Sequence, residues 1–352
     1  MSSTTGDLFS FGKETNGVPT SVDSVRGTHM VSVAGSRSTS LSLHPTTATF
    51  HSCNPAHQID PKDLPPGIVD VKFGETHAVV LTDKGQVFSY GKGKYGQLGL
   101  GGSASGMSTR VALPVLSALA DKRVVSISAG SHHTVALTEG GDVFSWGRGF
   151  EGQTGHASQA LTEEENNVLT AVQLLPKLIS AFVRHTVVSV SCGPSFTLCC
   201  TGEGSVWSWG EGGCGQLGIG RKKVQPIPTL VLPSAPHDSS PFTSVSCGWS
   251  HSLALTKSGS LYSWGLNNYG QLGLGDQKTR YYPEVVCGSD AGAGGGEGDA
   301  DGGVGGMKLE KVEAFGNYCM GLDGGGGVYS WGCNSSFQVS CCWCFCLGVN
   351  MF

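Results

Sequence analysis

The sequence contains few cationic residues and no long apolar segment. Its 352 residues include 22 Lys and Arg against 27 Asp and Glu, a formal net charge of −5, so a general nucleic-acid-binding surface is not expected. No run of eighteen apolar residues occurs, and we therefore predict no membrane-spanning segment. The first seven residues are polar and a predicted strand follows at once, so we expect no secretory signal peptide.

The sequence also lacks the phosphate-binding motif GxxxxGK[ST]. Three GxGxxG strings do occur, beginning at Gly91, Gly147 and Gly210. A dinucleotide site requires a helix to begin at the third glycine, whereas each string here is followed by Gln and recurs within a longer repeat. We therefore predict no cofactor and no small-molecule substrate.

Glycine is abundant, and most of the 55 glycines are periodic. Residues 248–275 read GWSHSLALTKSGSLYSWGLNNYGQLGLG, in which two short alternating apolar segments are separated by a turn and followed by a glycine-rich loop. This pattern is typical of a β-hairpin. Three further copies begin at Gly74, Gly130 and Gly193, each with a second glycine 17 positions on, and a shorter copy spans residues 316–332.

Weaker copies precede these strong ones. Segments around residues 8–12 and 48–52 fit the same spacing, so strand-end positions fall at 12, 52, 91, 147, 210, 265 and 332. Repeats of this length that are rich in short strands indicate a propeller or a solenoid. A closed ring buries both faces of each small sheet and leaves only short edges. We predict an all-β fold, a seven-bladed β-propeller with an incomplete last blade and short helices only in inter-blade insertions.

The repeated residues have structural roles in this interpretation. The aromatic residue before each strand-end glycine is predicted to be a wedge between blades, and the glycines permit positive φ or close approach. A histidine stands three residues after the opening glycine in three copies, and Phe196 and Cys319 fill that position in two others. Because they lie on different blades, these histidines cannot meet at one metal ion. No acid or nucleophile is placed consistently beside them, so no Ser-His-Asp set is predicted. We expect each ring nitrogen to bond a neighbouring backbone group. The repeat positions are Gly74, His77, Gly91, Gly130, His133, Trp146, Gly147, Gly193, Trp209, Gly210, Gly248, His251, Trp264, Gly265, Gly316, Trp331 and Gly332.

The thirteen cysteines are scattered, and several occupy strand positions. We interpret them as reduced and buried, as in a cytoplasmic or nuclear protein. The four cysteines within residues 341–346 are too close together for a usual zinc site, so no metal is predicted.

The repeated text Gly-x-x-His-Ser/Thr, Leu-Thr, Val-Tyr/Phe-Ser-Trp-Gly and Gly-Gln-Leu-Gly resembles the regulator of chromosome condensation (RCC1-type) repeat. The resemblance covers about residues 68–332 strongly and residues 8–58 weakly, and it implies a seven-bladed β-propeller. The family's founding member is a guanine-nucleotide exchange factor for the small GTPase Ran, and other members are a plant UV-B photoreceptor and domains of ubiquitin ligases. The photoreceptor's Gly-Trp-Arg-His-Thr motif has one relative here, at residues 248–252, which lacks the arginine, so photoreception is not expected.

The chain is predicted to hold one repeat domain, residues 1–332, and a divergent Cys-rich tail, residues 333–352. The domain comprises weak copies over 8–58, strong copies over 68–282, a disordered Gly/Asp-rich loop over 288–306 and a partial copy over 307–332. Because the repeat stops after Gln338 and the ring is half a repeat short, we interpret the tail as a truncation or gene-model artefact.

Each glycine-rich loop is followed by a proline, which we expect to precede the next blade's first strand (Pro114, Pro176, Pro228 and Pro283). The longest ordered insertion lies between Gly155 and Val187. Residues 162–165 form a capping-box pattern there and apolar residues follow up to Leu175, which predicts a short helix ended by Pro176. The acidic residues of this insertion form the candidate partner-contact loop: Glu163, Glu164 and Glu165.

The repeat predicts architecture better than activity. We predict a non-enzymatic protein–protein interaction scaffold that binds protein partners through loops on the propeller faces. The alternative is a guanine-nucleotide exchange factor for a Ran-like small GTPase. Neither hypothesis involves nucleic acid or a membrane.

Overall fold

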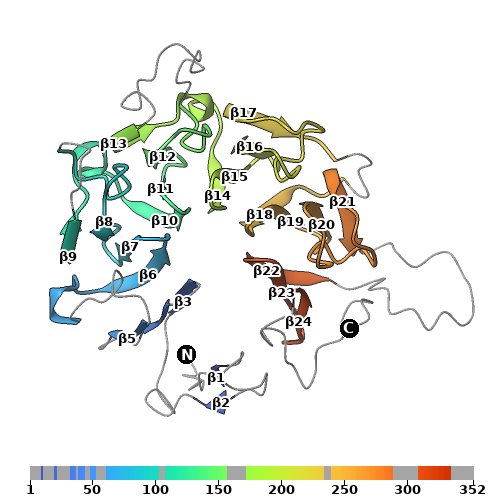
Figure 1. Ribbon diagram of the computed structural model, residues 1–352, viewed down its shortest axis with the longest axis horizontal. Helices are drawn as coiled ribbons and strands as arrows, with labels where there is room; N and C mark the ends of the chain where they lie inside the picture. Colours follow the sequence, from blue (N-terminus) through green and yellow to red (C-terminus); the bar gives the residue numbers. More distant parts are fainter. Residues whose placement is uncertain are drawn as a thin grey trace, which may run out of the picture.

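The computed structural model describes residues 61–102, 108–156, 172–233, 239–287 and 308–333, together with the backbone of five strands between residues 9 and 52. The strands form seven antiparallel sheets arranged around a central axis (Figure 1). Helical residues in this described part are limited to three short 3-10 turns, η4 (Pro61–Asp63), η5 (Ser117–Leu119) and η7 (Ser180–Phe182). The chain therefore has the predicted all-β propeller architecture.

Four of the sheets have four strands that follow one another along the chain from the channel to the rim. They are β6 (Ile68–Phe73), β7 (His77–Thr82), β8 (Val87–Lys92) and β9 (Ser108–Pro114); β10 (Val124–Ala129), β11 (His133–Thr138), β12 (Val143–Arg148) and β13 (Val172–Leu178); β14 (Val187–Cys192), β15 (Phe196–Thr201), β16 (Val206–Gly210) and β17 (Gln225–Val231); and β18 (Phe242–Cys247), β19 (His251–Thr256), β20 (Leu261–Gly265) and β21 (Arg280–Cys287).

The remaining sheets contain fewer strands. One has three strands, β22 (Leu309–Phe315), β23 (Tyr318–Asp323) and β24 (Val328–Gly332), and another has β3 (Ser32–Ser36), β4 (Thr39–Leu43) and β5 (Ala48–Ser52). The two-stranded sheet pairs β1 (Phe9–Ser10) with β2 (Thr20–Ser21). Strands β1 and β5 lie where the weak copies of the repeat place strands.

The hydrophobic core consists of layers between neighbouring sheets. Trp146 of β12 packs with Val79 and Leu81 of the preceding sheet, and Trp264 of β20 packs with Leu198 of β15. Both indoles have no exposed surface. Burying a large aromatic side chain stabilises a fold by several kcal/mol, so each layer holds two blades together.

The structure adds to one sequence-based expectation about the loops and corrects another. Pro114, Pro176, Pro228 and Pro283 each precede the first strand of the next blade, as predicted, and each lies in or at the end of the fourth, outermost strand of its own blade. An edge strand tolerates proline because the missing N–H faces solvent. The helix predicted to end at Pro176 is wrong from Val172 onward, where the chain pairs with β12 as β13; its earlier part lies outside the described residues.

Candidate functional site

The long loops of the described blades lie on one face of the ring. In each blade the first and third strands run toward this face, so it carries the turn between strands one and two and the loop between strands three and four. We call it the loop face. Its inner turns are joined across blades, since the Glu75 amide donates to the Ser131 carbonyl (3.1 Å) and the Ser131 amide donates to the Pro194 carbonyl (3.0 Å). These bonds fix the rim of the channel mouth.

The channel itself has a volume of about 1000 Å³ and is lined by the first strands of the described blades. Serine side chains bridge adjacent strands along its wall. The Cys192 amide donates to the Ser128 hydroxyl (2.9 Å), and the Cys247 amide donates to the Ser191 hydroxyl (3.0 Å). In the same way, the Ala314 amide of β22 donates to the Ser246 hydroxyl (2.9 Å). The serines therefore satisfy backbone groups that would otherwise be unpaired.

Charged side chains along the described channel wall occur on two of its strands. On β6, the Lys72 ammonium lies 3.3 Å from the Asp70 carboxylate. Burial raises the pKa of Asp70, and Lys72 opposes that effect. On β22, Lys311 and Glu313 line the opposite end of the described arc, and the Ser246 hydroxyl donates to Glu313 (3.3 Å).

The glutamine of each glycine-rich loop joins its blade to the next. The Gln97 carbonyl accepts bonds from the Trp146 indole (2.9 Å) and the Thr134 hydroxyl (3.1 Å), while its side-chain oxygen accepts from the Tyr95 amide (2.8 Å). The indole bond recurs between Trp209 and Gln153, Trp264 and Gln216, and Trp331 and Gln271, at 2.9, 2.8 and 3.0 Å. The repeated glutamine and tryptophan therefore form hydrogen bonds between adjacent blades of this chain.

The repeated histidines belong to the same junctions. The His77 Nε2 atom lies 3.0 Å from the Thr134 hydroxyl, and the His133 Nε2 atom lies 3.0 Å from the Thr197 hydroxyl. The partner is therefore a side-chain hydroxyl of the next blade, where a backbone group was predicted. Burial lowers the pKa of His133 to about 3, so its ring is neutral. A Cβ atom on Gly130 would lie 2.1 Å from the His133 ring, which explains the opening glycine.

The shorter copy is offset from the position that its spacing suggests. Tyr318 pairs with Gly332 as His133 pairs with Gly147, so Tyr318 occupies the histidine position and Cys319 the neighbouring hydroxyl position. The Cys319 Sγ atom consequently lies 3.0 Å from the Nε2 atom of His251.

The Cys319–His251 pair does not have the chemistry of a catalytic dyad. Both side chains are fully buried. Burial raises the pKa of Cys319 well above its usual value and lowers that of His251 to about 3. A thiol nucleophile needs a lowered pKa and access to its substrate, so this pair is a structural contact between two blades.

The described residues contain no group of three or more His, Cys, Asp or Glu side chains arranged to hold a metal ion. Nor does any helix among them have the length and apolar composition needed to cross a membrane.

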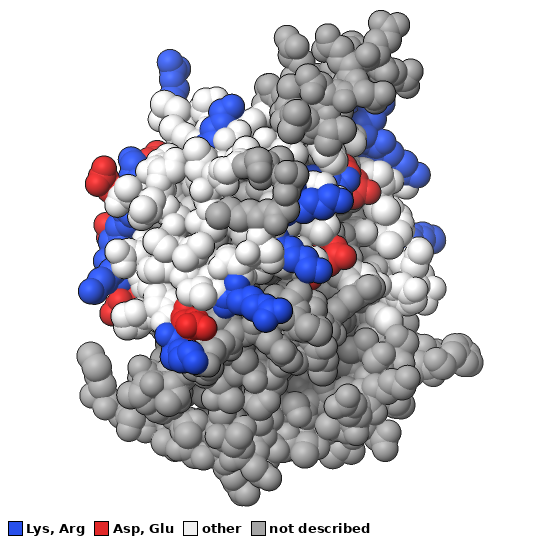
Figure 2. Space-filling model, turned by 60° about the vertical axis from the view of Figure 1, so that its left-hand side comes forward, with Lys and Arg blue, Asp and Glu red and all other residues white. Residues whose placement is uncertain are grey.

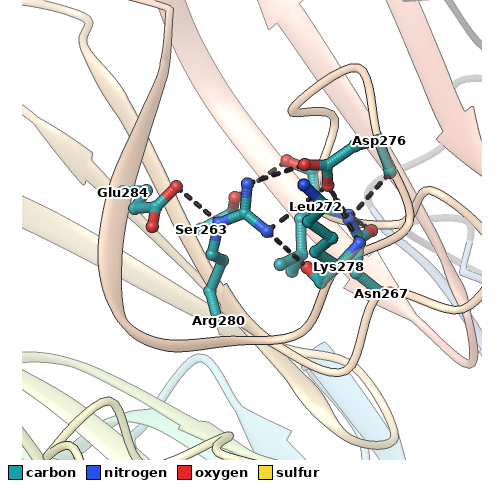
Figure 3. A network of polar contacts seen from close by, with 7 residues as sticks. All are labelled: Ser263, Asn267, Leu272, Asp276, Lys278, Arg280 and Glu284. Atoms are coloured by element: carbon teal, nitrogen blue, oxygen red, sulfur yellow. Dashed lines mark hydrogen bonds and ion pairs between the residues drawn. The ribbon is translucent and has the colours of Figure 1, made fainter.

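A polar network holds one long loop of the loop face in place (Figure 3). The Arg280 guanidinium binds the carboxylates of Asp276 and Glu284. The Asn267 side chain donates to the Asp276 carbonyl (2.9 Å) and accepts from the Leu272 amide (2.9 Å). The Asp276 carboxylate, whose pKa is lowered chiefly by its bond to Arg280, thus closes the β20–β21 loop.

An aromatic and arginine cluster on the loop face was not identified from the sequence. The Tyr95 ring centroid lies 5.1 Å from that of His132 and 6.1 Å from that of Phe150. The Arg148 guanidinium carbon lies 4.9 Å from the Phe150 ring centroid and 5.8 Å from the Tyr95 ring centroid. We call these four residues the Tyr95–Arg148 cluster. The cluster combines residues of two neighbouring blades. Their contact across the junction is visible in the structure and leaves no signal in the sequence of either repeat.

The predicted partner-contact loop, Glu163 to Glu165, lies outside the described residues, as do residues 288–306 and 334–352. On the side of the ring that Figure 2 brings forward, Lys and Arg side chains are separated by uncharged surface, and several have an acidic residue beside them. Among the described residues, the exposed Lys122 ammonium pairs with the Asp142 carboxylate (3.3 Å). This described surface is not a continuous basic patch.

The ring of small antiparallel sheets and its repeated inter-blade contacts define an RCC1-like β-propeller. The family model for the RCC1-like domain matches residues 2–342. The chain belongs to this family.

The chain is also similar to individual members. It is 34% identical to human E3 ubiquitin-protein ligase HERC2 over 272 residues, which is 77% of this chain and 5% of HERC2. It is 31% identical to the Arabidopsis thaliana ultraviolet-B receptor UVR8 over 276 residues, which is 78% of this chain and 55% of UVR8. The chain thus spans from a twentieth to about half the length of these curated relatives.

Solved structures have the same fold. Yeast RCC1 (Prp20), solved bound to Kap60, superposes with a TM-score of 0.73 at 18% identity, covering 98% of this chain and 81% of that one. Human WBSCR16 superposes with a TM-score of 0.68 at 23% identity, covering 87% and 75% of the two chains. These likenesses concern the fold alone.

Proposed function

We propose that this protein is a non-enzymatic interaction scaffold that binds protein partners through the loop face. The observation that carries the proposal is that the repeated polar side chains are already engaged in hydrogen bonds between blades. The Trp and His side chains, which each recur in three of the four strong copies and would be the first candidates for chemistry, bond neighbouring blades instead: Trp146 donates to Gln97, and His133 meets Thr197. The side chains left for a partner differ from blade to blade, as expected of a binding surface on a rigid scaffold.

The relatives support this role. HERC2 is a ubiquitin-protein ligase of which the matched segment is 5%, so an RCC1-like ring there is one module within a much larger enzyme. The seven described free cysteines, several of them buried, suit a reducing compartment. We propose that the protein works in the cytoplasm or the nucleus, and imaging a tagged full-length chain in its source cells checks this location.

The scaffold proposal is tested by affinity capture with purified full-length protein, followed by reconstitution of each candidate complex from purified components. We expect a protein that binds at micromolar concentration or better and is displaced by substitutions on the loop face. Failure to reconstitute any complex would contradict the proposal.

Exchange on a Ran-like GTPase is the second candidate, because one RCC1-fold neighbour, Prp20p, was solved in a study of its binding to Gsp1p and histones. Glu163, Glu164 and Glu165 supply the acidic loop for this alternative. The assay is release of a fluorescent guanine nucleotide from Ran and related GTPases. Under the scaffold proposal the release rate stays within about twofold of the spontaneous rate, and an acceleration of tenfold or more would favour exchange activity.

A further inference from the structure

The Tyr95–Arg148 cluster departs from the symmetry of the repeat. Its members occupy loop-face positions that every strong copy possesses, yet no other described junction carries the same combination of side chains. The position of Tyr95 holds Glu151, Cys214 or Tyr269; that of His132 holds Thr76, Ser195, Ser250 or Asn317; and that of Arg148 holds Lys92, Glu211, Leu266 or Cys333. Among the described blades, only this junction combines rings and a guanidinium at these positions. The fold does not require the cluster, because the other junctions form without it.

The guanidinium of Arg148 is held in place. It lies against the Phe150 and Tyr95 rings and donates to the Glu151 carboxylate (2.6 Å). Its Nε atom is buried and has no hydrogen-bond partner in the described part of the chain. The side chain as a whole keeps 28% of its surface exposed. An arginine ordered in this way loses little conformational entropy when it binds a partner.

The charge around the cluster is positive. Lys92 and Lys94 are exposed, and the Lys94 ammonium lies 5.2 Å from the Tyr95 ring centroid. Of the two acidic side chains nearby, Glu151 binds Arg148, and Glu75 lies 3.5 Å from the His132 ring, whose pKa is lowered chiefly by burial. Three cations therefore face two acids within a chain whose formal charge is −5. An anionic partner is attracted to this junction.

We propose that the Tyr95–Arg148 cluster is the docking site for an acidic segment of a protein partner. A partner carboxylate binds the free donors of Arg148, Lys92 and Lys94 attract further acidic residues, and an adjacent apolar side chain packs against the Phe150 and Tyr95 rings. Tyrosine and arginine are, with tryptophan, the residues enriched among those that dominate binding energy in protein interfaces. The inference rests on the scaffold function proposed above, since it names the kind of partner that the loop face binds.

The test begins with a phage-displayed library of random dodecapeptides selected on the full-length protein. We expect enrichment of sequences with Asp or Glu beside Phe, Leu or Trp. The best peptide is then synthesised, and its affinity is measured by fluorescence polarisation. We expect Arg148→Gln and Phe150→Ala each to weaken binding about tenfold or more, and Lys94→Glu to weaken it severalfold in a salt-dependent manner.

Tyr269→Ala is the matched control for Tyr95→Ala, because both tyrosines hold the same position of the repeat at different junctions. Only Tyr95→Ala should weaken binding, and circular dichroism checks that all variants fold. Enrichment of no acidic peptide, or equal effects of the two tyrosine substitutions, would overturn the proposal. So would tighter binding of a labelled single-stranded oligonucleotide than of the peptide, because bases also stack on aromatic and arginine side chains. If captured protein partners bind the Arg148→Gln variant unchanged, the scaffold function stands and this docking site does not.

Discussion

The indole nitrogen of Trp209 donates a hydrogen bond to the backbone carbonyl of Gln153, 2.9 Å away in the preceding blade. The Thr197 hydroxyl donates to the same carbonyl (3.0 Å). One buried acceptor thus receives two donors from the neighbouring blade. This relationship recurs around the described ring and fixes how each blade meets the next.

Trp209→Phe is therefore expected to lower the free energy of unfolding by about 1–3 kcal/mol, because it removes a buried hydrogen bond and leaves a small void. Urea denaturation followed by circular dichroism measures the change. Trp207→Phe is the control, since the Trp207 indole nitrogen is buried but has no hydrogen-bond partner in the described residues. Equal losses for the two variants would show that the bond to Gln153 contributes nothing.

Acidification should destabilise the fold through its buried histidines. Burial lowers the pKa of both His133 and His251 to about 3 in the native state, whereas an unfolded histidine has a pKa of about 6.5. Between these values the unfolded chain binds protons that the native chain does not, so stability is lost as the pH falls below about 6.5. The two residues together should lower the free energy of unfolding by about 2 kcal/mol between pH 6 and pH 5.

Urea titrations at several pH values measure this slope. Replacing His133 and His251 by Gln should reduce stability at pH 7, because each loses its contact across the junction, but should also flatten the pH dependence in this range. A slope that the double substitution leaves unchanged would assign the acid sensitivity to other groups.

Gly147 should not tolerate a side chain. Its φ is 104°, and a Cβ atom would lie 2.5 Å from the His132 carbonyl oxygen. Gly147→Ala is therefore expected to lower the free energy of unfolding by about 1–3 kcal/mol. Gly213, on the corresponding loop of the next blade, has open space around the added Cβ atom, so Gly213→Ala should be neutral or slightly stabilising. Thermal unfolding of the pair distinguishes strain at one glycine from a general need for flexible loops.

The serine bridges of the channel are expected to contribute to the stability of the fold. Ser191→Ala removes the acceptor of the Cys247 amide (3.0 Å), and leaving a buried amide unpaired costs about 1–3 kcal/mol. Ser191→Thr, which retains the hydroxyl, serves as the matched variant. If chemical denaturation finds the alanine variant as stable as the threonine variant, water in the channel has replaced the serine.

Much of this architecture could be predicted from the sequence because it repeats. Gly147 and its counterparts stand 17 positions after the opening glycine of each strong copy and directly after Trp or Tyr, and this pattern can be recognised as a blade junction without coordinates. The fourth strands could not be recognised in this way. In β13 the apolar residues also fit a helical spacing, and Pro176 marks an edge strand as readily as the end of a helix.

The candidate site was less predictable for a physical reason. Tyr95 lies in a loop and Arg148 ends β12, 53 positions further along the chain, and their contact depends on the packing of two blades. The sequence around Tyr95 does not indicate that it contacts Arg148, and the sequence around Arg148 does not indicate that it contacts Tyr95. The same holds for Cys319, whose partner His251 became apparent only when pairing with β24 fixed the register of the shorter copy.

The shared carbonyl of Gln153 has a consequence for how the ring comes apart. Separating one blade from the next breaks hydrogen bonds whose donors belong to one blade and whose acceptor belongs to the other. Opening one junction therefore exposes buried polar groups on both blades. Amide protons deep in β15 should then exchange with solvent at the same rate as those of β11 and β19, through a single concerted event. Proteases acting on the native protein would cut the outer loops and leave the cut blades joined to one another.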